Sequence, residues 1–276
     1  EALASTLGVT DRHLRRAMEA ELGVAPVELA QTRRLALAKQ LLQDTAMPLT
    51  DVAFASGFAS LRRFNALFKA RFARPPSALR RDHGSAGAGE AIALRLDYRP
   101  PLAWPALLAF LGARAIPGVE RLEGGVYRRA VRLGKCTGWL ALRHHEARHA
   151  IHVEVSFSLA PKLMALGARV RSLLDLDARP DAVAKHLGKD PALGRLVKAS
   201  PGLRVPGAFD GFEMATRAIL GQQVSVAGAT TLAGRLASAE GGVVHGDPVA
   251  GAQAFFHDHV VFVLLAQFDL LLFGLA

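Results

Sequence analysis

The sequence predicts a multi-domain chain. An all-α domain with two helix-turn-helix units is followed by an α+β domain built on an antiparallel sheet, and then by the start of a second all-α domain. Three observations support this fold class: a motif repeated within the first 81 residues, a segment of small polar residues after it, and a change from helical to alternating apolar spacing beyond that segment. We expect the domains at residues 1–82, 91–200 and 201–240, with a linker at 83–90 and an atypical apolar tail at 241–276.

The first copy of the motif contains Ala4 and Gly8. A small residue lets two helices cross closely, and a glycine four positions later supplies the positive φ of a tight turn. The hydroxyl of Thr10 is placed to cap the helix that follows. The inward face of that helix is expected to hold Leu14, Ala17 and Met18. Its outward face carries the side chains that we predict to contact DNA, which are Arg12, His13, Arg15 and Arg16.

The second copy repeats this order with Ala53, Gly57 and Ser60. Here the inward face of the second helix is expected to hold Leu61, Phe64, Leu67 and Phe68. The predicted DNA-contacting residues of this copy are Ser60, Arg62, Arg63, Asn65 and Lys69.

The rest of the first region also has helical spacing. A helix over 26–43 has proline in its first turn and is long enough to hold the two units apart. Pro75-Pro76 begins a short helix that continues to Arg81. The segment 82–89 (DHGSAGAG) is small and polar, which is typical of a linker.

The charge of the chain favours a polyanionic partner. Its formal net charge is +10, and the stretch from Ser60 to Arg81 contains seven Lys or Arg and no Asp or Glu. A basic stripe on one helix is typical of nucleic-acid binding. The alternative is an ordinary solvated face in an arginine-rich protein.

The single Cys136 excludes a disulfide or a cysteine-based zinc site within this chain and fits a reducing cytoplasm.

The second region begins with a strand over 92–98, which is expected to end at Pro100-Pro101, followed by a helix over 104–114. Further strands are expected at 126–133, 139–143 and 150–157. Helices are expected at 161–174, 180–187, 191–198 and 209–238.

The last stretch, 243–276, differs from what precedes it. Residues 260–276 are almost wholly apolar, interrupted by Gln267 and Asp269, and this run is short and charged for a membrane span, so we predict no membrane partner. A buried helix or a non-native tail left by a frameshift or premature stop would fit, and we favour the non-native tail.

The chain starts at Glu1 without a methionine or a signal peptide, so we expect an upstream part to be missing.

One motif points to a different chemistry. Residues 145–149 (HEARH) match the zinc-protease pattern H-E-x-x-H, which requires a helix so that both histidines share a face. Here the motif lies between two predicted strands, so we expect a turn, and we predict no metal. Cys136 has no flanking base and is interpreted as structural.

The run GFASLRRFNALFKARFARPPSALRR (57–81) resembles the signature of AraC-type transcription regulators, whose DNA-binding domains hold two helix-turn-helix units on one long helix. The family usually has glycine where this chain has Ala73. The resemblance implies two recognition helices entering successive major-groove segments. Arginines there can pair with guanine edges or phosphates, and Asn65 can read adenine.

The runs LDYRPPLAWPALLAFLGARA (96–115) and SPGLRVPGAFDGFEMATRAILGQQVSVAGATTLAGRLA (200–237) resemble the N-terminal half of AlkA-type 3-methyladenine DNA glycosylases, of the helix-hairpin-helix superfamily. The resemblance implies that Phe110 lines the pocket for a flipped base, that Gln222 and Gln223 lie at the DNA surface, and that Gln223 is the wedge filling the gap. The alternatives are core packing for Phe110 and an exposed helix start for the glutamines.

The family's second half carries a hairpin of the LPGIG type and then an Asp that stabilises the cationic sugar as the base leaves. Nothing after Gly221 matches it. The acids in that part of the chain (Glu240, Asp247, Asp258 and Asp269) follow no such hairpin. We therefore assign no catalytic residue and expect this chain not to cleave a glycosidic bond.

Three hypotheses remain. The first is a protein of the alkylation-damage response that combines an AraC-type (Ada-like) regulator with an AlkA-like base-excision repair module. The second is a transcription regulator in which the glycosylase-like part does no catalysis. The third is a truncated product whose incomplete helical domain exposes apolar faces. The expected partner is double-stranded DNA, at promoter sites and at alkylated lesions, with RNA polymerase as a further partner. We expect no cofactor and a location at the bacterial nucleoid in the cytoplasm.

Overall fold

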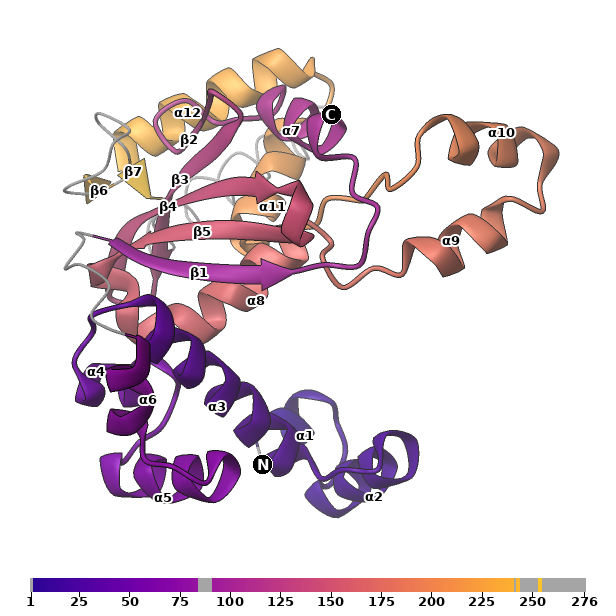
Figure 1. Ribbon diagram of the computed structural model, residues 1–276. Helices are drawn as coiled ribbons and strands as arrows, with labels where there is room; N and C mark the ends of the chain where they lie inside the picture. The colour runs from indigo at the N-terminus through magenta and orange to yellow at the C-terminus, as the bar shows by residue number, and fades with distance from the viewer. Residues whose placement is uncertain (1, 84–90, 241, 244–252, 255–276) are drawn as a thin grey trace. The chain divides into compact units, whose positions relative to one another are not determined.

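The computed structural model describes residues 2–83, 91–240, 242–243 and 253–254 (Figure 1). By its internal contacts the chain divides into two compact units, Glu1–Ala88 and Gly89–Ala276. The predicted linker, apart from His83, and most of the predicted tail lie outside the described residues. None of the described helices is long and apolar enough to cross a membrane.

The first unit is all helix, as predicted, and is organised around its longest helix. This helix, α3 (Pro26–Asp44), buries Leu35, Ala38, Leu41 and Leu42 at helical spacing. The other helices are α1 (Ala2–Thr6), α2 (Asp11–Leu22), α4 (Leu49–Ala55), α5 (Leu61–Phe72) and α6 (Pro76–His83).

The core of this unit is concentrated around the second helix-turn-helix. Phe64 and Phe68 of α5 are completely buried, and the ring centroids of Phe58 and Phe64 lie 5.3 Å apart. In contrast, α2 has no buried residue, and Ala17, which we expected to face inward, is exposed. The physical reason is that α2 has little apolar cover: Leu3 of α1, which could pack on it, is itself exposed.

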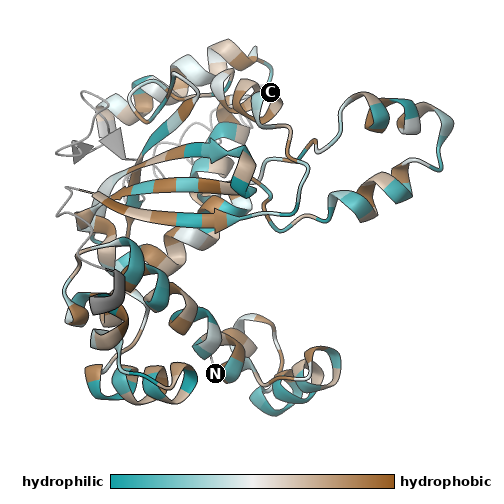
Figure 2. Ribbon diagram, viewed as in Figure 1, coloured by the Kyte–Doolittle hydropathy of each residue, from teal (hydrophilic) through white to brown (hydrophobic). Residues whose placement is uncertain are grey.

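The second unit is built on a five-stranded antiparallel sheet, which confirms the predicted α+β class. Its strands are β1 (Ala91–Asp97), β2 (Glu120–Glu123), β3 (Val126–Leu133), β4 (Cys136–His145) and β5 (Ala150–Ser156), in the order β1-β5-β4-β3-β2. Apolar and polar residues alternate along β1 and β5, as Figure 2 shows by colour. In register, Val153 of β5 lies between Leu94 of β1 and Leu142 of β4, and all three are buried.

Helices and short 3-10 segments complete this unit. They are α7 (Trp104–Gly112), η1 (Glu146–Arg148), η2 (Phe157–Lys162), α8 (Leu163–Leu173), α9 (Pro180–Leu187), α10 (Pro191–Ala199), α11 (Gly211–Leu220) and α12 (Val226–Glu240). A short pair of strands, β6 (Gly242–Val243) and β7 (Gln253–Ala254), follows. The single helix that we expected at 209–238 is wrong: residues 221–225 separate α11 from α12. The break matches a left-handed backbone at Gln223, with φ of 58°, which a helix cannot contain.

Hydrogen bonds from Arg204 and close packing at Gly202 hold the chain segment that precedes α7. The buried guanidinium of Arg204 donates to the backbone carbonyls of Arg99, Pro101 and Asp175. Gly202 has φ of 77°, and a Cβ there would lie 2.6 Å from the carbonyl carbon of Pro101. Glycine is therefore required where these two chain segments touch, and the contact holds the segment that leads into α7.

Candidate nucleic-acid interface

The first helix-turn-helix has the turn and cap that its sequence predicts. Ala4 is buried, and Gly8 has φ of 65°. The Oγ1 of Thr10 accepts a hydrogen bond of 3.2 Å from the backbone N–H of His13, which caps α2. A glycine in the left-handed conformation, Gly23, ends the helix.

The second helix-turn-helix repeats this geometry. Ala53 is completely buried, and Gly57 has φ of 81°. The Oγ of Ser60 accepts from the backbone N–H of Arg63 at 3.4 Å, which caps α5. The hydroxyl of Ser60 thus has a structural role in addition to the DNA contact that we predict for it.

The side chains predicted to contact DNA are exposed in both copies. On α2, three of them line an open surface hollow together with Glu19. The helix α5 carries four cations and no carboxylate, whereas α2 also carries Asp11, Glu19 and Glu21. The electrostatic attraction for phosphate is therefore stronger at α5. The exposed set consists of Arg12, His13, Arg15, Arg16, Ser60, Arg62, Arg63, Asn65 and Lys69.

In the second unit, Phe110 lies at the edge of a pocket between α7 and the start of α11. Its side chain is 41% exposed, so it is not a core residue of α7. The pocket has a volume of about 70 Å³, far below the roughly 300–1,000 Å³ of typical ligand sites. Apolar lining comes from Leu111, Leu173, Phe209 and Met214. The pocket as it stands is a shallow, partly apolar recess with one aromatic ring at its edge.

The face of the Phe110 ring is covered by a cation. The guanidinium carbon of Arg114, one helical turn further along the chain, lies 3.8 Å from the ring centroid. Its Nη1 donates to the carbonyl of Phe110 at 3.3 Å.

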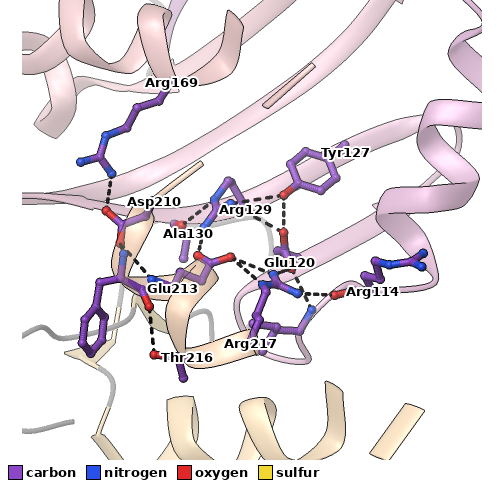
Figure 3. A network of polar contacts seen from close by, with 12 residues as sticks. Arg114, Glu120, Tyr127, Arg129, Ala130, Arg169, Asp210, Glu213, Thr216 and Arg217 are labelled. Carbon is purple, nitrogen blue, oxygen red and sulfur yellow. Dashed lines mark hydrogen bonds and ion pairs between the residues drawn. The ribbon is translucent and has the colours of Figure 1, made fainter. Parts of the chain in front are cut away.

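Four charged residues that line the pocket form a mostly buried network of polar contacts (Figure 3). Glu120 of β2 and Glu213 of α11 alternate with Arg129 of β3 and Arg217 of α11. Arg129 Nη2 lies 2.5 Å from Glu213 Oε2, and Arg217 Nη2 lies 2.8 Å from Glu213 Oε1. Tyr127 donates its hydroxyl hydrogen to Glu120. The network therefore joins strands β2 and β3 of the sheet to helix α11, and it contains two arginines and two glutamates.

Burial and the neighbouring charges shift the pKa values of several members of the network. Burial alone would raise the pKa of Glu213, but Arg129 and Arg217 outweigh it and hold that pKa below its ordinary value of 4.5. Burial would lower the pKa of Arg129, but the neighbouring Glu213, Tyr127 and Glu120 raise it. Burial and the adjacent Glu120 raise the pKa of Tyr127 well above its ordinary value, so its phenol stays protonated and donates.

The third carboxylate at the pocket, that of Asp210, is also paired with an arginine. Asp210 caps α11 by accepting from the N–H groups of Phe212 and Glu213 at 3.0 and 3.1 Å. It also pairs with Arg169 at 2.6 Å. Every carboxylate that lines the pocket, namely Glu120, Asp210 and Glu213, thus has an arginine partner.

Gln222 and Gln223 lie in the turn between α11 and α12 and are exposed. Ser225 caps the start of α12, since its Oγ accepts from the N–H of Gly228 at 3.1 Å. The two glutamines are not among the residues that line the pocket at Phe110. The turn presents them to solvent, with Gln223 in the left-handed conformation.

The H-E-x-x-H motif forms a turn, as predicted. His145 ends β4, η1 follows, and His149 has φ of 48° before β5 begins. The two histidines are therefore not on one helical face. His145 stacks on His152 at 5.1 Å, and His144 shares a hydrogen bond of 2.6 Å with the hydroxyl of Tyr98. Cys136 is half-buried at the start of β4.

Sequence reasoning did not identify the buried network or Arg114. The spacing of Glu213 and Arg217, four apart on a helix, was a signal for one of its ion pairs. Their partners Glu120 and Arg129 lie about ninety residues earlier in the sequence, and only the folded chain brings them together.

Comparison with known proteins agrees with the division of the chain into two units. A helix-turn-helix domain family matches residues 3–82, and the AlkA N-terminal domain family matches residues 93–210. A probable bifunctional transcriptional activator/DNA repair enzyme AlkA of Mycobacterium tuberculosis is 40% identical over 249 residues, which are 88% of this chain and 50% of that protein. DNA-3-methyladenine glycosylase 2 of Escherichia coli is 40% identical over 146 residues, 53% of this chain and 50% of that protein.

The chain therefore spans about half the length of these curated relatives. Among solved structures, a 3-methyladenine DNA-glycosylase from Archaeoglobus fulgidus superposes with a TM-score of 0.50 at 23% identity, over 58% of this chain and 54% of that one. That likeness concerns the fold alone. The two family matches and the geometry of the two units agree. The chain joins an AraC-type helix-turn-helix domain at residues 3–82 to an AlkA N-terminal domain at residues 93–210.

Proposed function

We propose that this protein binds DNA in the response to alkylation damage, combining sequence-specific transcription regulation with an AlkA-like module for alkylated DNA. The observation that carries the proposal is the pair of capped helices, α2 and α5, which present exposed cations from two repeated helix-turn-helix units. One long helix, α3, connects the two units. Such a pair of helices can enter successive segments of one major groove.

The most direct test removes the outward arginines of α5. Arg62→Ala with Arg63→Ala should abolish sequence-specific binding to the protein's operator, selected from a random duplex library, because both arginines are exposed on α5, whereas Phe64 of the same helix is buried. The matched control is Arg121→Ala, an exposed arginine of β2 in the second unit. Loss of specific binding with an unchanged circular-dichroism spectrum supports the proposal. Unchanged binding would move recognition to α2.

For the second unit we propose that Phe110 receives a displaced base and that Gln222 and Gln223 meet the duplex, with Gln223 as the wedge. An exposed aromatic ring beside an apolar recess supports the first assignment. Exposure at the tip of a turn supports the second. In this division, residues 91–200 form the α+β module and residues 201–240 begin the helical one. The protein would act at the chromosome in the bacterial cytoplasm, with RNA polymerase as the partner of the regulator.

A second candidate is regulation without base excision. It is favoured by the pairing of all three pocket carboxylates with arginines, which leaves none of them free to face a cationic sugar. Incubation of the full chain with alkylated duplex separates the two candidates when base release and duplex binding are measured on one sample. Binding without release supports regulation. Release of 3-methyladenine supports repair and requires a carboxylate outside the paired set.

A further inference from the structure

The arginine that covers Phe110 differs from the other cations at the pocket. Arg129 and Arg217 are each paired with Glu213 and Glu120. Arg114, within the described part of the chain, has the ring and the carbonyl of Phe110 as its contacts and no carboxylate partner. In Figure 3 its guanidinium points away from the network. One unbalanced positive charge therefore lies beside the one exposed aromatic ring of the pocket.

The backbone of Arg114 is fixed, whereas its side chain is only lightly held. Arg217 Nη1 donates to the carbonyl of Arg114 at 2.6 Å, which ties this residue to the buried network. The backbone N–H of Arg114 donates to Leu111 at 3.1 Å. The side chain itself is half-buried and has one hydrogen bond of 3.3 Å, so it can rotate while its backbone stays in place.

We propose that Arg114 is a movable cap of a nucleotide site. In the free protein its guanidinium covers the face of Phe110. When a nucleotide binds, the base takes that face and the guanidinium turns to the nucleotide's phosphate. The exchange conserves interactions, because stacking on the ring replaces the cation–π contact and a charge-assisted hydrogen bond replaces the one to the Phe110 carbonyl. The inference rests on the proposed role of Phe110 and adds a residue that selects a base carrying a phosphate.

The test compares two small probes, 7-methylguanosine and 7-methylguanosine 5′-monophosphate, titrated into the full chain and followed by NMR of its labelled phenylalanine rings. The wild-type chain should bind the monophosphate about two- to fivefold more tightly, as expected for one partly exposed ion pair. Arg114→Ala should lose this preference. It should also bind the nucleoside about two- to fivefold more tightly than the wild type, because no cation has to leave the ring.

Two further variants separate capping from structure. Arg114→Lys should keep the preference for the monophosphate, because an ammonium also pairs with phosphate. Arg195→Ala is the matched control: its guanidinium also bonds to the carbonyl four residues earlier, at 3.2 Å, but it covers no ring. It should leave both affinities unchanged.

The outcomes are distinct. If Arg114→Ala keeps the monophosphate preference, or gains nothing for the nucleoside, the cap does not exist. If no variant binds either probe, Phe110 is no stacking site and the cap is likewise overturned. The wider proposed function is decided separately by duplex binding and base release, so a chain that binds duplex normally while failing the probe titration keeps its function and loses only this site.

Discussion

Glu213 is the residue on which the buried network depends most. It is 6% exposed and contacts both Arg129 and Arg217. Replacing Glu213 with Gln leaves the buried guanidinium of Arg129 and the partly buried one of Arg217 facing one remaining carboxylate, and we expect a loss of about 3 kcal/mol of unfolding free energy. The measurement is urea unfolding followed by tryptophan fluorescence, since Trp104 and Trp139, the chain's two tryptophans, both belong to the second unit.

The matched control for this substitution is Glu123→Gln. Glu123 pairs with Arg121 at 3.1 Å, but both side chains are about half exposed, so the change should cost less than about 1 kcal/mol. Equal losses for the two variants would mean that burial does not set the strength of the network.

The same residue predicts how stability depends on pH. The pKa of Glu213 is lowered in the folded chain, so its contribution is fully present above its ordinary pKa of 4.5 and is lost as the pH falls through the lower folded value. The second unit of the wild type should therefore lose stability between about pH 5 and pH 3 more steeply than that of Glu213→Gln. Urea midpoints measured across this range check the slope, and parallel curves would contradict the assignment.

At the scale of elements, the end of α5 contains a residue that its backbone does not suit. Ala73 has φ of 58°, in the left-handed region where glycine is favoured. Ala73→Gly should stabilise the first unit by about 0.5–1 kcal/mol, because the Cβ no longer opposes this conformation. Hydrogen exchange of the α5 amide groups measures the change.

The control for the helix end is a glycine placed inside the same helix. Ala70 is exposed and lies within α5, so Ala70→Gly should destabilise it by about 1 kcal/mol. Opposite signs at positions 70 and 73 are expected. The same sign at both would mean that the left-handed conformation of Ala73 costs nothing.

At the scale of the whole molecule, the charge of the chain makes its DNA binding sensitive to salt. The net charge is +10, and seven cations lie between Ser60 and Arg81. With about six phosphate contacts, affinity for duplex DNA should fall roughly a thousandfold between about 50 and 200 mM salt, because bound counterions are released. Fluorescence anisotropy across this range measures the slope. A salt-independent affinity would show that the basic stripe does not contact phosphate.

The sequence by itself determined the parts whose signals are local. Gly8 and Gly57 predicted the two turns, and Thr10 and Ser60 predicted the caps that the structure shows. Alternating apolar residues located β1, strand-like runs located β3, β4 and β5, and flanking strands identified the H-E-x-x-H motif as a turn. In each case, the conformation depends on residues only a few positions apart.

Tertiary structure decided what depends on distant partners. The strand β2, with the sequence ERLE, has no pattern of its own and forms because β3 pairs with it. The break between α11 and α12 interrupts a run that is helical in spacing. Glu120 and Arg129 meet Glu213 and Arg217 across about ninety residues, and Arg217 also donates to the backbone carbonyl of Arg114. Burial makes these charges pair with one another, and burial is a property of the folded chain rather than of any local segment.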